Sequence, residues 1–170
     1  MKVAFKAIDY LIENPTPLNL LALNKVFIVG IPFNAPHSFK IEKITDELVQ
    51  ISLPNKKLNQ NHLGGVHACA IATLGEFCAG LGILKHFKIA EYRLIMSELN
   101  VTYSYQAKKN LIGKSDLHFD RQQIQKDLDD SGKSTQSLKT KVFDIDGQEV
   151  AVVTTTWQIK KWNLVRTKLQ

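Results

Sequence analysis

The sequence has few cysteines, few chain-breaking residues and a modest share of charge. Its 170 residues include only two cysteines, Cys69 and Cys78, which excludes a disulfide framework and is typical of reduced thiols in a cytosolic protein. Nine glycines and five prolines are too few for a collagen-like chain or for long flexible linkers. Charged residues make up 22% and hydrophobic residues 44%, which excludes a disordered chain and favours a single domain over residues 1–170.

The sequence also lacks a segment that fits a signal peptide or a membrane span. Residues 18–31 are apolar, but they contain Asn24 and Lys25 and follow two prolines, unlike the apolar region of a signal peptide. Residues 66–84 form the longest apolar run and contain Glu76 and three glycines, which a membrane span of about 20 residues rarely tolerates. We therefore expect a buried helix in a cytoplasmic protein, with no membrane insertion.

Neither the positive charge nor the histidines form a concentrated site. The net charge of +6 comes from Lys and Arg residues scattered along the chain, whereas nucleic-acid binding usually requires a denser basic stripe with exposed aromatic residues. We expect no nucleic-acid partner. The spacing of four of the histidines does not match a metal site, so we predict no metal and no cofactor; these are His37, His62, His86 and His118.

The first part of the chain combines helical and strand patterns. Apolar positions at helical spacing predict helices over residues 2–13 and 18–29, which together form an N-terminal helical extension of residues 1–30. Alternation of apolar and polar residues then predicts two strands, over residues 39–42 and 49–53. A turn at residues 45–47 joins them.

The rest of the chain predicts one long helix and a set of strands. Residues 64–86 are too long an apolar segment for a strand and predict the central helix. Alternating and β-branched stretches predict four later strands, over residues 99–106, 114–119, 138–145 and 149–159. A short helix within residues 120–137, capped near Gly132, interrupts them. The expected fold class is α+β, with an antiparallel sheet of about six strands around one long apolar helix.

A polar and glycine motif precedes and enters the central helix. Asn61, Gly64, His67 and Glu76 lie at offsets 0, 3, 6 and 15. Together with the order of elements, this spacing resembles the hotdog-fold acyl-CoA thioesterase superfamily, in particular an uncharacterised subgroup of the phenylacetyl-CoA thioesterase-like branch. The resemblance implies hydrolysis of an acyl-CoA to a free acid and coenzyme A. It also implies a homodimer, or a dimer of dimers, with sites between subunits.

The chain departs from the family pattern at the start of the helix. Ala68 and Cys69 stand where the family has two glycines, and Glu76 stands where this branch more often has Asp. An alternative therefore remains open, in which the protein is a non-catalytic hotdog module that binds an acyl or hydrophobic ligand. The resemblance also makes Gly64, Gly65 and Thr73 candidates for binding the substrate.

The physical requirements of thioester hydrolysis lead to the same residues. The first turn of a helix has unpaired N–H groups and a positive dipole end, so the N–H of Ala68 is a candidate donor to an oxyanion. Glu76 lies in an apolar helix, where desolvation raises the pKa of a carboxyl and makes it a competent base near neutral pH. Glu76 would either activate water or attack the carbonyl to give an anhydride, with Asn61 and His67 positioning the thioester or the water.

The spacing of His67 and Glu76 has a consequence for assembly. Nine residues of helix correspond to about 900° of rotation and about 13.5 Å of rise, so the two side chains face opposite sides. We therefore expect a two-fold dimer in which the helix start of one subunit approaches Glu76 of the other.

Each candidate also has a structural interpretation. Glu76 could be a hydrogen-bonded group at a dimer seam, and His67 could cap the helix. Asn61 could form an Asx turn, and Gly64 with Gly65 fits any turn before a helix.

Overall fold

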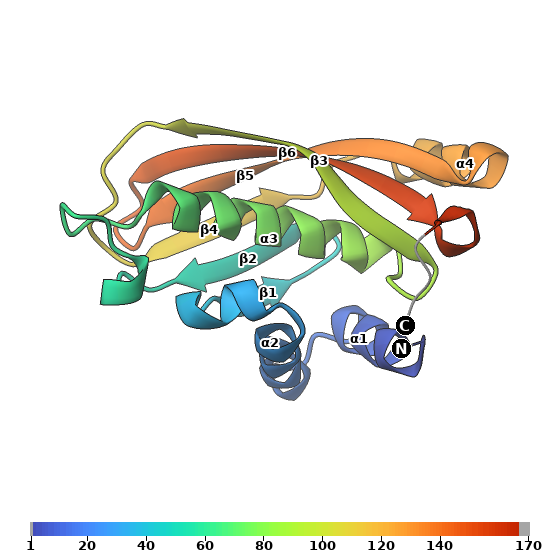
Figure 1. Cartoon of the computed structure of the whole chain (residues 1–170), viewed down its shortest axis with the longest axis horizontal. Coiled ribbons are helices and arrows are strands. Elements are labelled where there is room, and N and C mark those ends of the chain that lie inside the picture. Colours follow the sequence, from blue (N-terminus) through green and yellow to red (C-terminus); the bar gives the residue numbers. More distant parts are fainter. Residues whose placement is uncertain (1, 167–170) are drawn as a thin grey trace.

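In the computed structural model, which describes residues 2–166, six strands form one antiparallel sheet that curves around a long helix (Figure 1). The strand order is β1-β2-β4-β5-β6-β3. The helices and strands are α1 (Lys2–Glu13), α2 (Pro17–Gly30), β1 (Lys40–Ile44), β2 (Leu48–Leu53), α3 (Ala68–His86), β3 (Tyr92–Tyr103), β4 (Leu111–Asp116), α4 (Arg121–Ser131), β5 (Lys133–Asp144) and β6 (Glu149–Lys161). The predicted α+β class, the six strands and the wrapped central helix are confirmed; Met1 and residues 167–170 of the predicted domain lie outside the described range.

The central helix α3 is packed unusually close to the sheet. Eleven of its 19 residues are buried. A Cβ added at Gly75 would lie 2.3 Å from the Cβ of Val153 on β6, and one added at Gly82 would lie 2.3 Å from a methyl carbon of Leu117. The glycines therefore let the helix backbone approach the sheet, which explains their frequency in an otherwise apolar helix. Among the described residues, α3 alone is long and apolar enough to cross a membrane, and here it serves as the core helix.

Helix α3 begins at Ala68, four residues later than the predicted start at residue 64. Gly64 has a left-handed φ of +72°, which a helix cannot continue through. The N–H of Val66 donates to the carbonyl of Ala107 at 2.7 Å, and the N–H of His67 donates to the carbonyl of Asn59 at 2.7 Å. These tertiary hydrogen bonds hold the segment as a loop.

Three strand boundaries differ from the sequence prediction. Strand β3 begins at Tyr92 rather than residue 99, because it pairs with β6 from Tyr92 to Tyr103. Strand β4 covers Leu111–Asp116 instead of residues 114–119, since β2 and β5 both pair with it from Leu111. Strand β5 begins at Lys133 instead of residue 138, and its first residues pair with the end of β6. In each case pairing with a neighbouring strand sets the boundary, and local alternation does not report it.

Several short-range signals are confirmed. Thr45 closes the β1–β2 turn, where its Oγ1 accepts a hydrogen bond from the N–H of Leu48 at 3.0 Å. Gly147, with φ of +88°, occupies the β5–β6 turn that its Asp-Gly pair predicts. Asp120 caps α4, and Gly132 ends it in the left-handed conformation.

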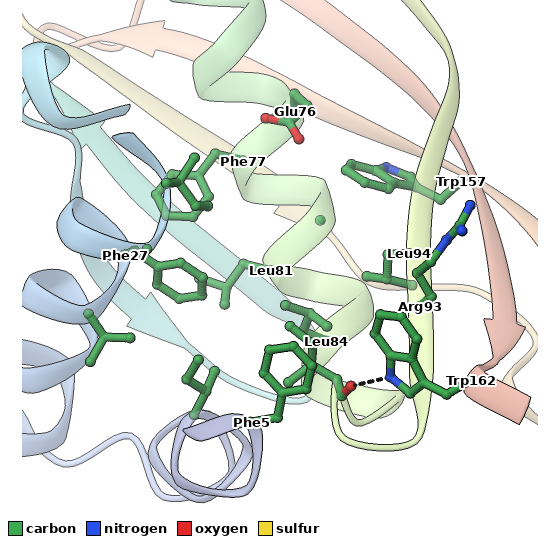
Figure 2. Close-up of a pocket in the computed structure, with 16 residues that line it drawn as sticks. Phe5, Phe27, Glu76, Phe77, Leu81, Leu84, Arg93, Leu94, Trp157 and Trp162 are labelled. Carbon is green, nitrogen blue, oxygen red and sulfur yellow. Dashed lines mark hydrogen bonds between the residues drawn. The ribbon is translucent and has the colours of Figure 1, made fainter. Parts of the chain in front are cut away.

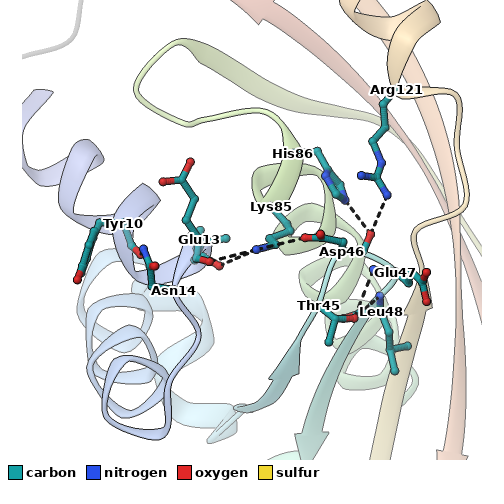
Figure 3. A network of polar contacts seen from close by, with 11 residues as sticks. Tyr10, Glu13, Asn14, Thr45, Asp46, Glu47, Leu48, Lys85, His86 and Arg121 are labelled. Carbon is teal, nitrogen blue, oxygen red and sulfur yellow. Dashed lines mark hydrogen bonds and ion pairs between the residues drawn. The ribbon is translucent and has the colours of Figure 1, made fainter.

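The two N-terminal helices are confirmed, and they pack against the sheet and the central helix. Helix α2 packs on β1 and α1 packs on α3. The Asp9 carboxylate of α1 is buried and accepts hydrogen bonds from the N–H groups of Ile89 and Ala90, at 2.9 and 3.1 Å. Lys85 of α3 donates to the carbonyl of Glu13 at 3.3 Å and forms an ion pair with Asp46 at 3.4 Å, as Figure 3 shows.

Candidate functional site

The loop before α3 is shaped by the side chain of Asn61. Its Oδ1 accepts hydrogen bonds from the N–H groups of Leu63 and Gly65, at 2.9 and 3.2 Å. The backbone N–H of Asn61 also donates to the carbonyl of Gly65 at 2.8 Å. A Cβ at Gly65 would lie 3.0 Å from the carbonyl oxygen of Ala107, so this position favours glycine. Asn61 therefore forms an Asx-type turn that shapes the loop, and its side-chain amide nitrogen donates no hydrogen bond within residues 2–166.

His67 is the N-cap of α3. Its Nδ1 accepts a hydrogen bond from the N–H of Cys69 at 3.1 Å, which assigns the proton of the neutral ring to Nε2. The ring is exposed, and Nε2 is free to reach a ligand at the helix start.

The N–H of Ala68 opens the helix without an acceptor. It donates no hydrogen bond within residues 2–166, and it lies at the N-terminus of α3, which is the positive end of the helix dipole. Tyr103 of β3 donates its hydroxyl to the carbonyl of Ala68 at 2.9 Å, which fixes this first turn. The Ala68 N–H is therefore available to a ligand at the helix start. The contact made by Tyr103 was not found by the sequence analysis, which assigned this residue only to a strand.

Thr73 and Glu76 lie on the stripe of α3 that the sheet leaves uncovered. Both are half-buried, whereas Leu74 and Gly75 between them are fully buried against the sheet. The Thr73 hydroxyl donates to the carbonyl of Cys69 at 2.8 Å, one turn earlier. The uncovered stripe therefore joins the helix start to Glu76 along one side of α3. His67 is the N-cap and lies outside the helix, so the helical rotation that the sequence analysis counted from His67 to Glu76 does not apply.

Glu76 is the most perturbed carboxylate in the described part of the chain. Burial raises its pKa from 4.5 to about 6. Its oxygens accept no hydrogen bond from any residue in the range 2–166, so the interpretation of Glu76 as a hydrogen-bonded group at a dimer seam requires a partner from a second subunit. A carboxyl with this pKa is largely ionised at neutral pH and remains a good proton acceptor.

An apolar cavity of about 360 Å³ opens beside Glu76. We call it the Glu76 cavity. Figure 2 shows Glu76 at one end, Phe5 and Trp162 at the other, and Leu81 and Leu84 between them. Its walls come from α1, α2, α3, β3, β6 and the short helix at Trp162–Leu164. The sequence predicted the N-terminal helices but not the cavity that they line. The signal available was a pair of apolar helices with no second layer assigned to cover them.

The structure brings together some of the predicted site residues and separates others. The loop and helix-start residues form one cluster; they are Asn61, Gly64, Gly65, His67 and Ala68. Glu76 lies eight residues beyond Ala68, about 12 Å along the helix axis. Among the described residues no group of three His, Cys, Asp or Glu side chains is arranged to hold a metal ion.

An antiparallel sheet with the strand order β1-β2-β4-β5-β6-β3 around a single long helix defines the hotdog fold. The Asn61 loop precedes this helix, and Glu76 lies within it. A family model matches residues 21–159 of the chain. The chain therefore belongs to that family, DUF4442, a domain of unknown function.

Solved structures show the same fold. A protein of unknown function and probable thioesterase from Pseudomonas aeruginosa is 24% identical, with a TM-score of 0.74 over 83% of this chain and 95% of that one. A thioesterase enzyme from Staphylococcus aureus is 21% identical, with a TM-score of 0.64 over 76% and 98%. A thioesterase from Haemophilus influenzae is 10% identical, with a TM-score of 0.71 over 88% and 94%. Among curated proteins, none matches the chain significantly.

Proposed function

We propose that the protein is a thioesterase that hydrolyses an acyl-CoA to a free acid and coenzyme A. The observation that carries the proposal is the carboxyl of Glu76, whose pKa burial raises to about 6, at the end of an apolar cavity. A thioester has an apolar acyl group and a carbonyl that needs a base or nucleophile, and the cavity and Glu76 match these two parts. The solved relatives described as thioesterases support this reading of the fold.

The chemistry assigns one task to each group. As a base, Glu76 takes a proton from water while the water oxygen bonds to the thioester carbon; as a nucleophile, its carboxylate bonds to that carbon and water then opens the anhydride. In both routes the carbon–sulfur bond breaks and the sulfur leaves with a proton as the thiol of coenzyme A. The free N–H of Ala68 stabilises the oxyanion, while Asn61 and His67 position the water or the thioester.

The distance between these groups favours a two-fold dimer. Ala68 and Glu76 are about 12 Å apart along one helix, too far to act on one carbonyl carbon. Strand β3 is an edge strand that pairs only with β6 in the described chain, and it exposes Ile95, Leu99 and Tyr103. A second subunit docked on this edge would place its helix start opposite Glu76.

The two free cysteines fit a reducing cytoplasm as the place where the protein acts.

A panel of acyl-CoAs, assayed by thiol release with wild type and Glu76→Gln, tests the proposal. We expect wild type to turn over at least one acyl-CoA and Glu76→Gln to lower kcat/KM by a factor of about 10² or more, because the amide can neither accept the proton nor attack. Glu91→Gln removes an exposed glutamate outside the Glu76 cavity and is expected to keep full activity. A folded Glu76→Gln protein with the wild-type rate would contradict the assignment.

The second candidate is a non-catalytic module that binds an acyl or hydrophobic ligand. The observation that favours it is the pair Ala68 and Cys69 in place of the family's glycines, since the Ala68 methyl group lies beside the proposed oxyanion donor. The same panel separates the two candidates. Turnover supports the enzyme, whereas tight acyl binding with no thiol release supports the module.

A further inference from the structure

The shape of the Glu76 cavity restricts what can occupy it. Of its sixteen lining residues, only Glu76 and Arg93 are ionisable; the others are apolar or aromatic residues and glycine. Glu76 and Leu84 are eight residues apart on α3, so the cavity runs about 12 Å along the helix. An apolar space about 12 Å long with a single carboxylate at its end matches an extended chain that carries its reacting group at one end.

Length and volume give the same size of occupant. Carbon–carbon bonds of about 1.5 Å advance a stretched alkyl chain by about 1.25 Å per carbon, so about 12 Å corresponds to about nine or ten carbons. A cavity of about 150 Å³ holds one benzene ring, so the 360 Å³ beside Glu76 holds about twelve to fourteen carbon-sized atoms, counting the thioester group.

The far end of the cavity is closed by the N-terminal helices. Phe5 of α1 stacks on Trp162 with ring centroids 6.0 Å apart, and the Trp162 indole donates to the carbonyl of Ile89 at 2.8 Å. Asp9 holds α1 to the segment before β3 through two hydrogen bonds to backbone N–H groups. The floor is therefore fixed in place and ends the space available to a chain.

We propose that α1 and α2 form the floor and one wall of an acyl-chain site, which selects straight-chain acyl groups of about eight to ten carbons. This proposal rests on the proposed thioesterase function, because it places the reacting carbonyl at Glu76 and runs the chain along α3 toward Phe5. Longer chains meet the Phe5–Trp162 stack, and shorter chains leave apolar surface of the cavity unfilled.

Gly30, the last residue of α2, offers a sharp test. It lines the cavity, and a Cβ added there meets no atom within 4 Å, so the first carbon of a side chain has room beside the cavity. Gly30→Leu is expected to fill part of the cavity and lower kcat/KM for decanoyl-CoA at least tenfold relative to butanoyl-CoA. Val29→Leu is the matched control, because Val29 is 81% exposed and outside the cavity, and it is expected to keep the wild-type chain-length profile.

Phe5→Ala provides the opposite change and a second route to a result if Gly30→Leu does not fold. Removal of the ring opens the floor, so the preferred chain is expected to lengthen from octanoyl or decanoyl toward tetradecanoyl. Circular dichroism confirms that each variant is folded. An unchanged profile in the folded variants, from butanoyl-CoA to hexadecanoyl-CoA, would overturn the proposal.

Binding of free decanoate, measured by calorimetry, separates this proposal from the proposed function. If wild type hydrolyses acyl-CoAs but Gly30→Leu and Phe5→Ala leave both chain-length preference and decanoate affinity unchanged, the thioesterase stands and the acyl site is wrong. If no acyl-CoA is hydrolysed, the enzyme proposal fails. Decanoate binding that Gly30→Leu weakens at least tenfold and Val29→Leu does not would then still support the acyl site, and absence of decanoate binding would overturn it.

Discussion

A carboxylate on a helix that a sheet surrounds loses much of its hydration, and Glu76 is held in this setting. It lies on the uncovered stripe of α3, yet the apolar walls of the Glu76 cavity desolvate it enough to raise its pKa to about 6. No side chain in the described part of the chain offsets this by a hydrogen bond. The folded protein therefore maintains an unfavourable charge at neutral pH, and perturbed groups of this kind cluster at functional sites.

This charge predicts a pH-dependent stability difference between wild type and Glu76→Gln. The pKa of Glu76 is higher in the folded state than in the unfolded state. Its contribution to the free energy of unfolding is therefore fully present below the unfolded pKa of 4.5 and is lost as the pH rises through about 6. A pKa raised from 4.5 to about 6 corresponds to about 2 kcal/mol. Urea denaturation is expected to show Glu76→Gln more stable than wild type by up to about 2 kcal/mol at pH 7.5, with equal stability near pH 4.

Glu91→Gln is the control for the same measurement, because it makes the same change at an exposed glutamate. It is expected to track wild type at both pH values. A stability difference for Glu76→Gln that is the same at both pH values would mean that burial of the charge is not its cause.

At the scale of elements, α3 is positioned by small residues rather than by large ones. Gly75 lets the helix backbone approach β6, and its carbonyl accepts a hydrogen bond from the buried Thr140 hydroxyl of β5 at 3.0 Å. The contact sets the depth of the helix in the sheet. It therefore also sets the position of Glu76, one residue further along.

Gly75→Ala is expected to destabilise the protein by about 1–3 kcal/mol, since the new methyl group would lie 2.3 Å from the Cβ of Val153. Chemical denaturation measures the loss. Gly30→Ala is the matched control: a Cβ there meets nothing within 4 Å, so its stability should stay equal or rise slightly. Equal stability of Gly75→Ala and wild type would show that the helix can move outward at little cost.

At the scale of the whole molecule, one chain holds apart the two groups that the proposed function assigns to one site. The helix start and Glu76 are separated by about 12 Å, and the β3 edge beside them is unpaired in the described chain. A two-fold axis near this edge would combine the halves of two chains into two complete sites. The N-terminal helices would then close each acyl-chain site from within its own subunit.

A mixture of two inactive variants tests the shared site. One variant has Glu76→Ala, and the other has His67→Ala with Ala68→Leu. Half of randomly assembled dimers are mixed, and each mixed dimer has one intact site of two, so co-refolding is expected to restore about a quarter of wild-type activity. Thiol release measures this recovery.

Each variant refolded alone is the control and should remain inactive. If mass spectrometry shows subunit exchange while the mixture stays as inactive as its parents, the two halves of the site do not come from different subunits.

Local sequence signals predicted the parts of the fold that are determined by neighbouring residues. Thr16 and Pro17 mark the start of α2, and the Asp-Gly pair ending at Gly147 marks the β5–β6 turn. The motif spacing likewise gave the position of Glu76 in an apolar helix, and burial alone explains its raised pKa. The sequence by itself therefore determined the class of fold, the order of its elements and the chemical identity of the candidate site.

Features that depend on distant residues were decided by the tertiary structure. Strand β3 begins at Tyr92 because β6 pairs with it there, and α3 begins at Ala68 because hydrogen bonds to Asn59 and Ala107 hold the preceding loop. The Glu76 cavity exists only because α1 and α2 fold back beside α3, through contacts such as Asp9 to the backbone before β3. Such contacts join segments up to about eighty residues apart in the chain, so they cannot be predicted from the local periodicity of the sequence.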